Sequence, residues 1–321
     1  MNLYPLKFKP ILKERIWGGN KLKSVLNKET NLSKIGESWE VSDVEGDTSV
    51  ISNGFFKGTS LKSLQKQLKG DLIGEKNYKL FKDQFPILIK FIDAKEDLSI
   101  QLHPNDELAA KRHNSFGKTE MWYVMQADED AKLILDFNQQ MDREKYLYHL
   151  NNKTLPQVLN FEKVSSGDAY YIEVGRVHAI GAGVMLAEIQ QTSDVTYRLY
   201  DWGRIDENGS PRELHVDLAL DAIDFDMPKN YKVDYKKLTN FSNEMVFCPY
   251  FKTSYLELTE SVQKENNYDS FLIYINVEGE AIIESENFSE IINKGETVLL
   301  PAAIKNFRIS ADHCKLLEVY V

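Results

Sequence analysis

Two histidines, a glutamate and a glutamine stand where they could hold a divalent metal ion. Residues 98–103, LSIQLH, alternate between apolar and polar side chains, which is typical of a β-strand with one buried face. Side chains two positions apart in a strand share a face, so Gln101 and His103 should project together. Pro104 biases His103 toward extended geometry. The pattern therefore predicts a strand end that presents an amide and an imidazole side by side.

Glu120 and His178 could complete this site. Glu120 opens a hydrophobic strand after the turn at residues 117–119, and His178 lies on the strand that follows Gly175. Two imidazoles, a carboxylate and an amide oxygen suit a borderline divalent ion, zinc first, with room for water or substrate. A lone histidine at a strand end is more often a satisfied core or surface residue, and Glu120 and Gln101 alone could be a turn carboxylate and a solvated amide; their joint occurrence makes a metal site an equal alternative. The other histidines lack such context and are interpreted as structural: His113, His149, His215 and His313.

Strands must position these residues. Short apolar or alternating runs bounded by Gly, Asn, Asp and Pro predict strands at 40–42, 85–92, 98–103, 121–125, 132–137, 168–173, 185–190 and 196–200. Helical patterns are fewer, at 59–68, 105–113, 142–151 and 211–223. Numerous strands without regular strand–helix alternation favour a mainly β fold, an antiparallel barrel or sandwich, over a doubly wound sheet.

The chain divides into two predicted domains, residues 1–235 and residues 236–321, joined by a polar linker at 229–237. An internal repeat accompanies this division. His178 follows Gly167 by eleven positions, and Asn306 follows Gly295 by the same offset, with a predicted strand between the two residues in each case. Two copies of one β-barrel unit would explain the length, and only the first copy would then keep metal-binding side chains.

Composition narrows the class of protein. The 321 residues carry a formal charge of −10 and no Lys/Arg block, which disfavours nucleic acid as a partner. An acidic protein that binds an anion must focus its few cations locally, in a cleft. Cys248 and Cys314 are too few for a disulfide framework. The N-terminus lacks a secretory signal and the longest apolar runs are too short to cross a bilayer, so we expect a cytoplasmic protein that binds neither a membrane nor an obligatory protein partner.

Five motifs in order make the sequence recognisable. They are GESWEVS at 36–42, QLHP at 101–104, GKTEMW at 117–122, GRVHAI at 175–180 and YRLYDW at 197–202. Together they resemble the type I mannose-6-phosphate isomerases, and the remainder resembles the C-terminal cupin-like barrel of the short bacterial form. The resemblance implies a cupin fold, reversible conversion of mannose 6-phosphate to fructose 6-phosphate, and one zinc ion per chain bound by Gln101, His103, Glu120 and His178.

The resemblance also implies roles for pocket residues. An aldose–ketose isomerisation passes through an enediolate, and a metal and nearby cations would offset the negative charge that develops on oxygen. Arg198 is similar to the family's active-site arginine, and Lys118 shares a strand face with Glu120, two residues away. Further matches are Glu188 as a catalytic residue, and Lys90 and Asp194 as substrate-binding residues. The residues do not decide which group is the base or which cation holds the phosphate.

The sequence departs from the family in two places, and two other classes of protein stay open. The helical insert of the long form is missing, and Glu173 replaces the cupin proline five residues before His178. An iron-dependent cupin dioxygenase would also use two histidines and a carboxylate, but it needs neither Gln101 nor the Lys118 and Arg198 pair. A non-catalytic sugar-binding regulator would need an output domain, and neither a helix-turn-helix nor a basic segment is visible.

Overall fold

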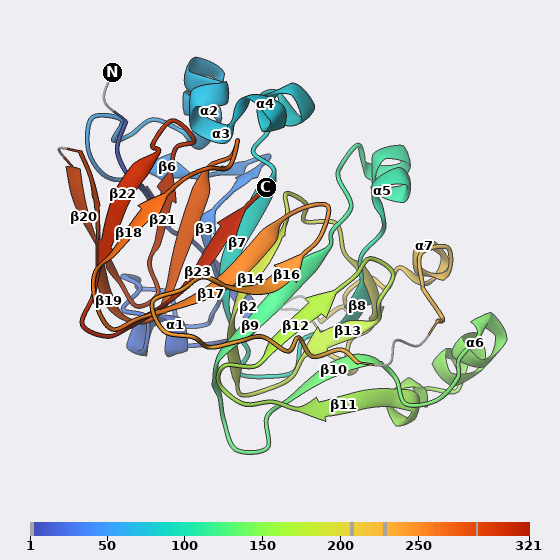
Figure 1. Cartoon of the computed structure of the whole chain (residues 1–321). Coiled ribbons are helices and arrows are strands. Elements are labelled where there is room, and N and C mark those ends of the chain that lie inside the picture. Colours follow the sequence, from blue (N-terminus) through green and yellow to red (C-terminus); the bar gives the residue numbers. More distant parts are fainter. Residues whose placement is uncertain (1–2, 206–208, 227–229, 287) are drawn as a thin grey trace.

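A computed structural model of the chain describes residues 3–205, 209–226, 230–286 and 288–321. In this part of the chain antiparallel strands dominate, and they form three large sheets and one small one (Figure 1). The small sheet contains only β4 (Asp43–Val44) and β5 (Asp47–Thr48). None of the described helices is long and apolar enough to cross a membrane.

Two of the large sheets form what we call the first unit. The six-stranded sheet has the order β12 (Ala169–Ile172), β9 (Glu120–Ala127), β14 (Val184–Gln191), β7 (Ile87–Asp93), β3 (Ile35–Val41) and β2 (Ile11–Gly19). The five-stranded sheet has the order β11 (Leu159–Lys163), β10 (Lys132–Phe137), β13 (His178–Ile180), β8 (Ile100–Leu102) and β15 (Tyr197–Tyr200). One apolar cluster, which includes Trp122, Leu186 and Leu133, contains side chains from both sheets.

The third large sheet is the second unit. Its main path runs β16 (Asn243–Phe247), β17 (Lys252–Leu258), β23 (Cys314–Tyr320), β19 (Leu272–Ser285), β21 (Thr297–Leu300), β1 (Leu6–Lys9) and β6 (Val50–Ile51). Off this path lie β18 (Val262–Glu265), β20 (Phe288–Asn293) and β22 (Asn306–Ser310). Figure 1 shows the second unit's strands from residues 243–320, orange to red, beside the green strands of the first unit.

The six-stranded sheet lies between two apolar layers. One face contributes to the cluster shared with the five-stranded sheet, and the other contributes Ile89, Met121 and Ala187 to a cluster with residues of the second unit such as Ile273 and Leu317. Because both faces are covered, every residue of β7 and β14 is buried. A strand covered on both faces reads as a continuous apolar run rather than an alternating one.

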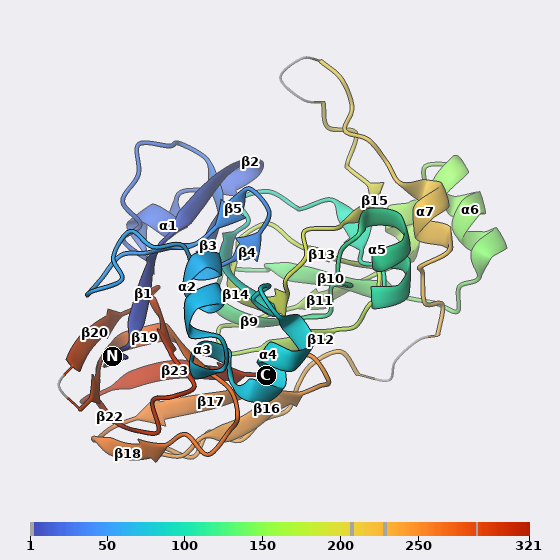
Figure 2. The same ribbon diagram turned by 90° about the horizontal axis from the view of Figure 1, so that it is seen from above.

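The helices are short and few compared with the strands. The model contains α1 (Lys21–Ser24), α2 (Leu61–Leu68), α3 (Gly70–Ile73), α4 (Glu75–Phe81), α5 (Asp106–His113), α6 (Arg143–Asn151), the 3₁₀ helix η1 (Leu155–Val158) and α7 (Val216–Leu220). Residues of α6, η1 and α7 pack in one cluster with the five-stranded sheet. Figure 2 shows α6 and α7 at the end of the molecule away from β18 and β22.

The predicted strands and three of the four predicted helices are confirmed. In α5 the predicted cap is also present, since the Asn105 side chain accepts a hydrogen bond from the Leu108 amide at 2.9 Å. The helix predicted at 211–223 is wrong in its extent, because α7 begins only at Val216. Pro211 instead forms a bridge with Ile205, and the Arg212 side chain is paired with Asp201. These tertiary contacts override the helical pattern of the sequence.

The predicted repeat is confirmed in the structure. Gly167 and Gly295 both have a positive φ, 87° and 81°. A strand begins two residues after each glycine, β12 in the first unit and β21 in the second. The next strand begins eleven residues after each glycine, at His178 and at Asn306. The second unit thus repeats the antiparallel arrangement of this segment, and the fold class is mainly β, as predicted.

The boundary at residues 235 and 236 stays a prediction. Lys229, where the predicted linker begins, lies outside the described residues, and residues 230–237 contain neither helix nor strand. This segment contacts β12, since the Val233 amide donates to the Ala169 carbonyl at 2.8 Å. One feature of the topology was not predicted. The strand β1, near the N-terminus, pairs with β21 of the second unit.

Candidate active site

Three of the predicted ligands, His103, Glu120 and His178, meet inside the first unit. All three are buried, and their ligand atoms lie within 4.8 Å of one another. Glu120 lies between the imidazoles, with one carboxylate oxygen 3.5 Å from Nε2 of His103 and the other 3.4 Å from Nε2 of His178. Three donor atoms thus surround one point, which is the arrangement a divalent ion requires.

Strand register brings Gln101 to the same place. Gln101 pairs with His178 across β8 and β13, and with Arg198 across β8 and β15. Directly opposed residues of antiparallel strands lie on the same face of the sheet. Nε2 of Gln101 is 3.5 Å from Nε2 of His178. Because half a turn of the carboxamide exchanges its oxygen and nitrogen, Gln101 can direct its oxygen to the same point.

Hydrogen bonds fix the tautomer of both imidazoles. Nδ1 of His103 lies 2.9 Å from the Val195 carbonyl oxygen, and Nδ1 of His178 lies 2.9 Å from the Arg176 carbonyl oxygen. A carbonyl only accepts, so each Nδ1 carries the proton and each Nε2 keeps its lone pair. Burial lowers the pKa of His178 to about 3 and that of His103 well below its ordinary value. Both rings are therefore neutral at pH 7, the form that binds metals.

The residues present fit a metal ion. Both carboxylate oxygens of Glu120 are buried, and Oε2 is paired with the Lys118 ammonium at 2.7 Å, whereas Oε1 has no hydrogen-bond partner among the described residues. Burial raises the pKa of Glu120 to about 7, with a further contribution from the charge of Glu188. A buried carboxylate is costly unless a cation or hydrogen bonds compensate it. A divalent ion held by His103, Glu120 and His178 would supply further compensation for this charge.

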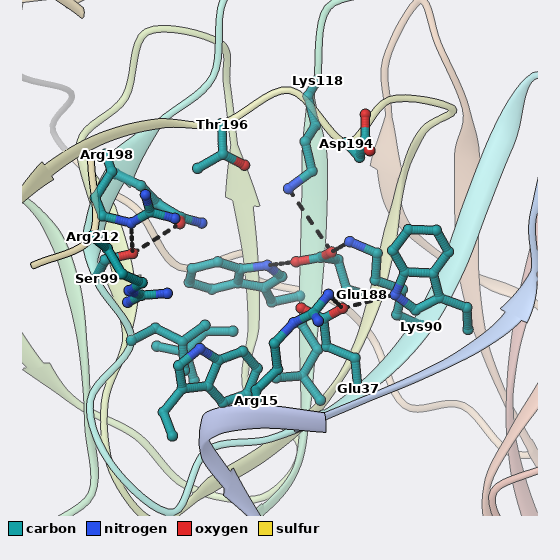
Figure 3. A pocket seen from close by; sticks show the side chains of 17 residues that line it. Arg15, Glu37, Lys90, Ser99, Lys118, Glu188, Asp194, Thr196, Arg198 and Arg212 are labelled. Atoms are coloured by element: carbon teal, nitrogen blue, oxygen red, sulfur yellow. Dashed lines mark hydrogen bonds and ion pairs between the residues drawn. The ribbon is translucent and has the colours of Figure 1, made fainter. Parts of the chain in front are cut away.

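A pocket of about 420 Å³ opens beside this group (Figure 3). Five cations and three carboxylates line it, although the chain as a whole carries a net charge of −10. A local excess of cations is what an acidic protein needs in order to bind an anionic ligand. The charged lining residues are Arg15, Glu37, Lys90, Lys118, Glu188, Asp194, Arg198 and Arg212.

Lys90 and Glu188 form a buried ion pair on neighbouring strands. They are direct partners across β7 and β14, and Nζ of Lys90 lies 3.0 Å from Oε1 of Glu188. The other carboxylate oxygen accepts a hydrogen bond from the indole nitrogen of Trp122 at 2.9 Å. Burial alone would raise the pKa of Glu188, but Lys90 and Lys118 outweigh it and lower that pKa to about 2. Glu188 is therefore ionised.

Lys118 joins the pocket to the ligand group. Its ammonium lies 2.7 Å from Oε2 of Glu120, 2.9 Å from Nε2 of His103 and 4.0 Å from Oε1 of Glu188. Burial opposes the charged form, but the two carboxylates outweigh it and raise the pKa of Lys118. The predicted shared face of Lys118 and Glu120 is thus confirmed by direct contact, and the lysine is a permanent cation.

Arg198 and Asp194 also face the pocket. The Arg198 guanidinium donates to the Glu213 carbonyl at 2.9 Å and to Ser99 Oγ at 3.4 Å. No carboxylate of the described residues lies within ion-pair distance of it. Asp194 is exposed. The structure thus gathers all nine predicted site residues around one pocket and its metal-ligand group.

Sequence reasoning assigned no role to three charged residues of the pocket. Glu37 accepts hydrogen bonds from Arg15 at 2.9 Å and from the indole of Trp39 at 2.8 Å. Arg212 enters from the segment after β15 and is paired with Asp201. Glu37 and Trp39 belong to the GESWEVS motif and lie two residues apart on β3. Side chains two apart in a strand share a face, so the sequence could have predicted that these two point the same way. No such sequence pattern marks Arg15 and Arg212, because their positions in the pocket depend on neighbours distant in sequence.

The chain resembles known proteins along almost its whole length. The family model described as phosphomannose isomerase type I, catalytic domain, matches residues 5–135, and the mannose-6-phosphate isomerase cupin domain matches residues 242–321. The mannose-6-phosphate isomerase ManA of Bacillus subtilis is 35% identical over 96% of each chain. The mannose-6-phosphate isomerase of Streptococcus mutans is 30% identical over 96% of each chain. A crystal structure of the mannose 6-phosphate isomerase from Bacillus subtilis superposes with a TM-score of 0.88 at 30% identity, covering 99% of both chains.

Fold and site together define a cupin-type protein whose first unit holds a buried His/Glu/His group at a cationic pocket. Within that class, the chain belongs to the type I mannose-6-phosphate isomerase family. Neither a dioxygenase nor a sugar-binding regulator is needed to explain the site.

Proposed function

We propose that the chain interconverts mannose 6-phosphate and fructose 6-phosphate in the pocket of Figure 3. The names of its full-length relatives support this activity. The observation that carries the proposal is the buried group of His103, Glu120 and His178 next to a pocket with an excess of cations. A sugar phosphate needs both features, because one end carries the phosphate charge and the other end develops charge during reaction.

Gln101, His103, Glu120 and His178 would hold one divalent ion, and their mixture of nitrogen and oxygen donors favours zinc. The bound ion would act as a Lewis acid toward the substrate oxygens. The protein fixes the ligands in advance, because two carbonyl oxygens orient the imidazoles and the strand pairing of β8 with β13 places Gln101. Outer contacts of this kind orient metal ligands and hold their tautomers.

Lys118 and Arg198 would stabilise the enediolate. In the forward reaction a proton leaves C2 of the aldose and a proton is added at C1, while the hydroxyl proton of O2 is lost and O1 gains one, so no atom is gained or lost. Negative charge develops on the substrate oxygens in between, where fixed cations lower the barrier. Lys118 touches the ligand group, and Arg198 is the direct strand partner of Gln101. Both cations would thus lie next to the reacting end of the substrate.

Glu188 would serve as a fixed negative charge in the same pocket. Its lowered pKa makes it a weak proton acceptor, because a general base works best with a pKa near the working pH. It holds the ammonium of Lys90 at 3.0 Å and lies 4.0 Å from that of Lys118. We therefore assign Glu188 to orienting these cations toward the substrate, and Lys90 and Asp194 to binding it.

A coupled assay with mannose 6-phosphate tests the proposal. The purified chain should form fructose 6-phosphate, lose this activity after exhaustive chelation, and regain it when zinc is added. A matched titration with magnesium controls for a nonspecific effect of divalent ions, because magnesium prefers all-oxygen sites. Full activity in a chain shown by elemental analysis to be metal-free would contradict the metal-dependent mechanism. No activity in the zinc-loaded chain would contradict the function.

A further inference from the structure

The segment that precedes His178 is clamped by a buried ion pair outside the pocket. Arg176 donates through its guanidinium to Asp136 on β10. Their side chains are 6% and 1% exposed, so the pair is shielded from water. The guanidinium also donates to the Asp226 carbonyl at 2.8 Å and to the Asp224 carboxylate at 3.3 Å. Neither Arg176 nor Asp136 lines the pocket.

This ion pair and the ligand His178 share backbone contacts. The Arg176 carbonyl oxygen lies 2.9 Å from Nδ1 of His178 and fixes the tautomer of the ring. The Asp136 amide donates to the Val177 carbonyl at 2.6 Å, and Leu135 pairs with His178 across β10 and β13. Asp136 thus holds the two residues before His178, one through its side chain and the other through its backbone.

The backbone of Asp136 is in an unusual conformation. Its φ is 65°, in the left-handed region that non-glycine residues seldom adopt, and the register of β10 with β11 shifts at this point. Such a conformation persists only where the surroundings over-determine it, and it is common at functional sites. One carboxylate oxygen of Asp136 has no hydrogen-bond partner among the described residues, so Arg176 provides the main compensation for this buried charge.

We infer that Asp136 and Arg176 are positioning residues that hold His178 in its metal-binding orientation. This inference rests on the proposed function, since it assumes that His178 is a ligand. The side chain of Arg176 is bonded to Asp136 on β10, and its carbonyl oxygen orients the ring of His178. Losing the ion pair would therefore free that carbonyl, and the ring with it. Mutation of an outer partner of a metal ligand typically costs about 10- to 100-fold in metal affinity or activity. The two side chains make no hydrogen bond or ion pair with a residue that lines the pocket within the described part of the chain, so turnover at saturating metal should not depend on them.

The test compares zinc affinity in three variants by competition with a chromophoric chelator. Asp136→Asn removes the charge but keeps a residue that tolerates positive φ, and Arg176→Met keeps much of the side-chain volume. Each should bind zinc roughly 10- to 100-fold more weakly, with kcat at saturating zinc within about threefold of wild type. Glu40→Gln is the matched control. It removes the negative charge from the buried Lys28–Glu40 pair, which contacts no ligand.

Each outcome decides between the positioning role and its alternatives. If Asp136→Asn and Glu40→Gln weaken zinc binding equally, the pair contributes only general stability and the inference is wrong. The inference also fails if wild type binds zinc and both variants at the clamp keep wild-type affinity. A wild-type chain that binds no zinc would instead overturn the metal centre on which the inference rests, and this result needs no assay of turnover.

Discussion

At the scale of single residues, the cations of the pocket differ in what neutralises them. Lys90 is paired with Glu188, Lys118 with Glu120, and Arg15 and Arg212 with Glu37 and Asp201. Arg198 has only neutral acceptors within reach among the described residues. Burial lowers the pKa of Arg198, and the neighbouring charge of Arg212 lowers it further. Both effects disfavour the isolated cation, so an anion bound beside it would be stabilised. Arg198 is therefore the pocket cation most available to a charge that appears during reaction.

Replacement of Arg198 by alanine should act mainly on kcat. Removing one donor that stabilises an oxyanion costs about 10²–10³ in rate, roughly 3–4 kcal/mol. We expect this loss with zinc content and melting temperature near wild type, since the guanidinium makes no ion pair within the described part of the protein. Arg198→Lys should recover little, because an ammonium cannot reproduce the planar fork. Steady-state kinetics on both variants give the answer.

The matched control for Arg198→Ala is Arg308→Ala. Arg308 is an exposed arginine on β22, so its replacement should leave kcat and KM unchanged. A kcat of Arg198→Ala within about threefold of wild type, with only KM raised, would move Arg198 from catalysis to substrate binding.

Replacement of His178 by alanine should remove most bound zinc. The remaining donors would bind the ion weakly in competition with water, so zinc affinity should fall by more than about 100-fold, beyond the usual effect of an outer partner. Turnover should fall with it. Elemental analysis of the dialysed variant checks the first expectation. His149→Ala is the control, because His149 contacts Thr154 outside the site. A His178→Ala chain with full zinc and a normal rate would remove His178 from the ligand set.

At the scale of elements, a short turn holds two ligands in place. The Gly175 amide donates to the His103 carbonyl at 2.8 Å, and its own carbonyl accepts from the Asp224 amide at 2.9 Å. Its φ is 79°, and a Cβ added there would lie 2.5 Å from the Ala222 carbonyl oxygen. The turn thus connects His103 to the segment that leads into His178, and it allows no side chain.

Gly175→Ala should destabilise the protein and weaken zinc binding together. Gly46 is the matched control, because its φ is 83° but an added Cβ would meet nothing within 4 Å. Gly46→Ala should cost only the left-handed strain, about 1–2 kcal/mol. Gly175→Ala adds a clash between the new Cβ and the Ala222 carbonyl oxygen. It should therefore lower the free energy of unfolding more than Gly46→Ala does. Thermal unfolding and zinc competition measure both effects. Equal losses in the two variants would show that the contact with Ala222 is unimportant.

At the scale of the whole molecule, the duplication extends to side-chain pairs. In the first unit Trp122 and Glu188 are cross-strand partners, and the indole donates to the carboxylate at 2.9 Å. In the second unit Tyr274 and Glu318 are the corresponding partners, and the phenol donates to the carboxylate at 2.5 Å. An aromatic donor beside a buried glutamate is thus present in both copies. The metal ligands are not duplicated in this way.

Strand register identifies what replaced the ligands in the second unit. Glu120 pairs with Ile172 five residues after Gly167, and the equivalent pair after Gly295 contains Leu272 in place of Glu120. Asn306 stands in place of His178 and is exposed. A leucine and an exposed amide do not make a metal site. The second unit therefore contributes packing against the six-stranded sheet rather than a second centre.

We predict one tightly bound metal ion per chain. Elemental analysis of the purified protein should give about one equivalent of zinc, from the single site the donor set supports. Asn306→Ala should leave that content and the isomerase rate unchanged, apart from any change in stability. Two tightly bound ions per chain would contradict the assignment of Leu272 and Asn306 as the replacements.

Local periodicity made much of this protein predictable. The alternation in 98–103 placed Gln101 and His103 on one strand face, and the offset of eleven residues after Gly167 and Gly295 revealed the repeat. The first feature follows from the two-residue period of a strand, and the second from the conformation of a turn glycine. Both depend only on residues that are close in sequence. The family motifs added the expected ligands and pocket residues, and the structure gathers them around one pocket.

Only the tertiary structure decided which distant residues join that pocket and what holds them. Arg15, Arg212 and the clamp of Asp136 on Arg176 depend on contacts between segments far apart in sequence, which no local period encodes. The same holds for β1, which pairs in the second unit, and for residues 211–215, which tertiary contacts keep out of the predicted helix. Sequence periodicity determines which face of a strand a side chain occupies, whereas the pairing of sheets determines what that face meets.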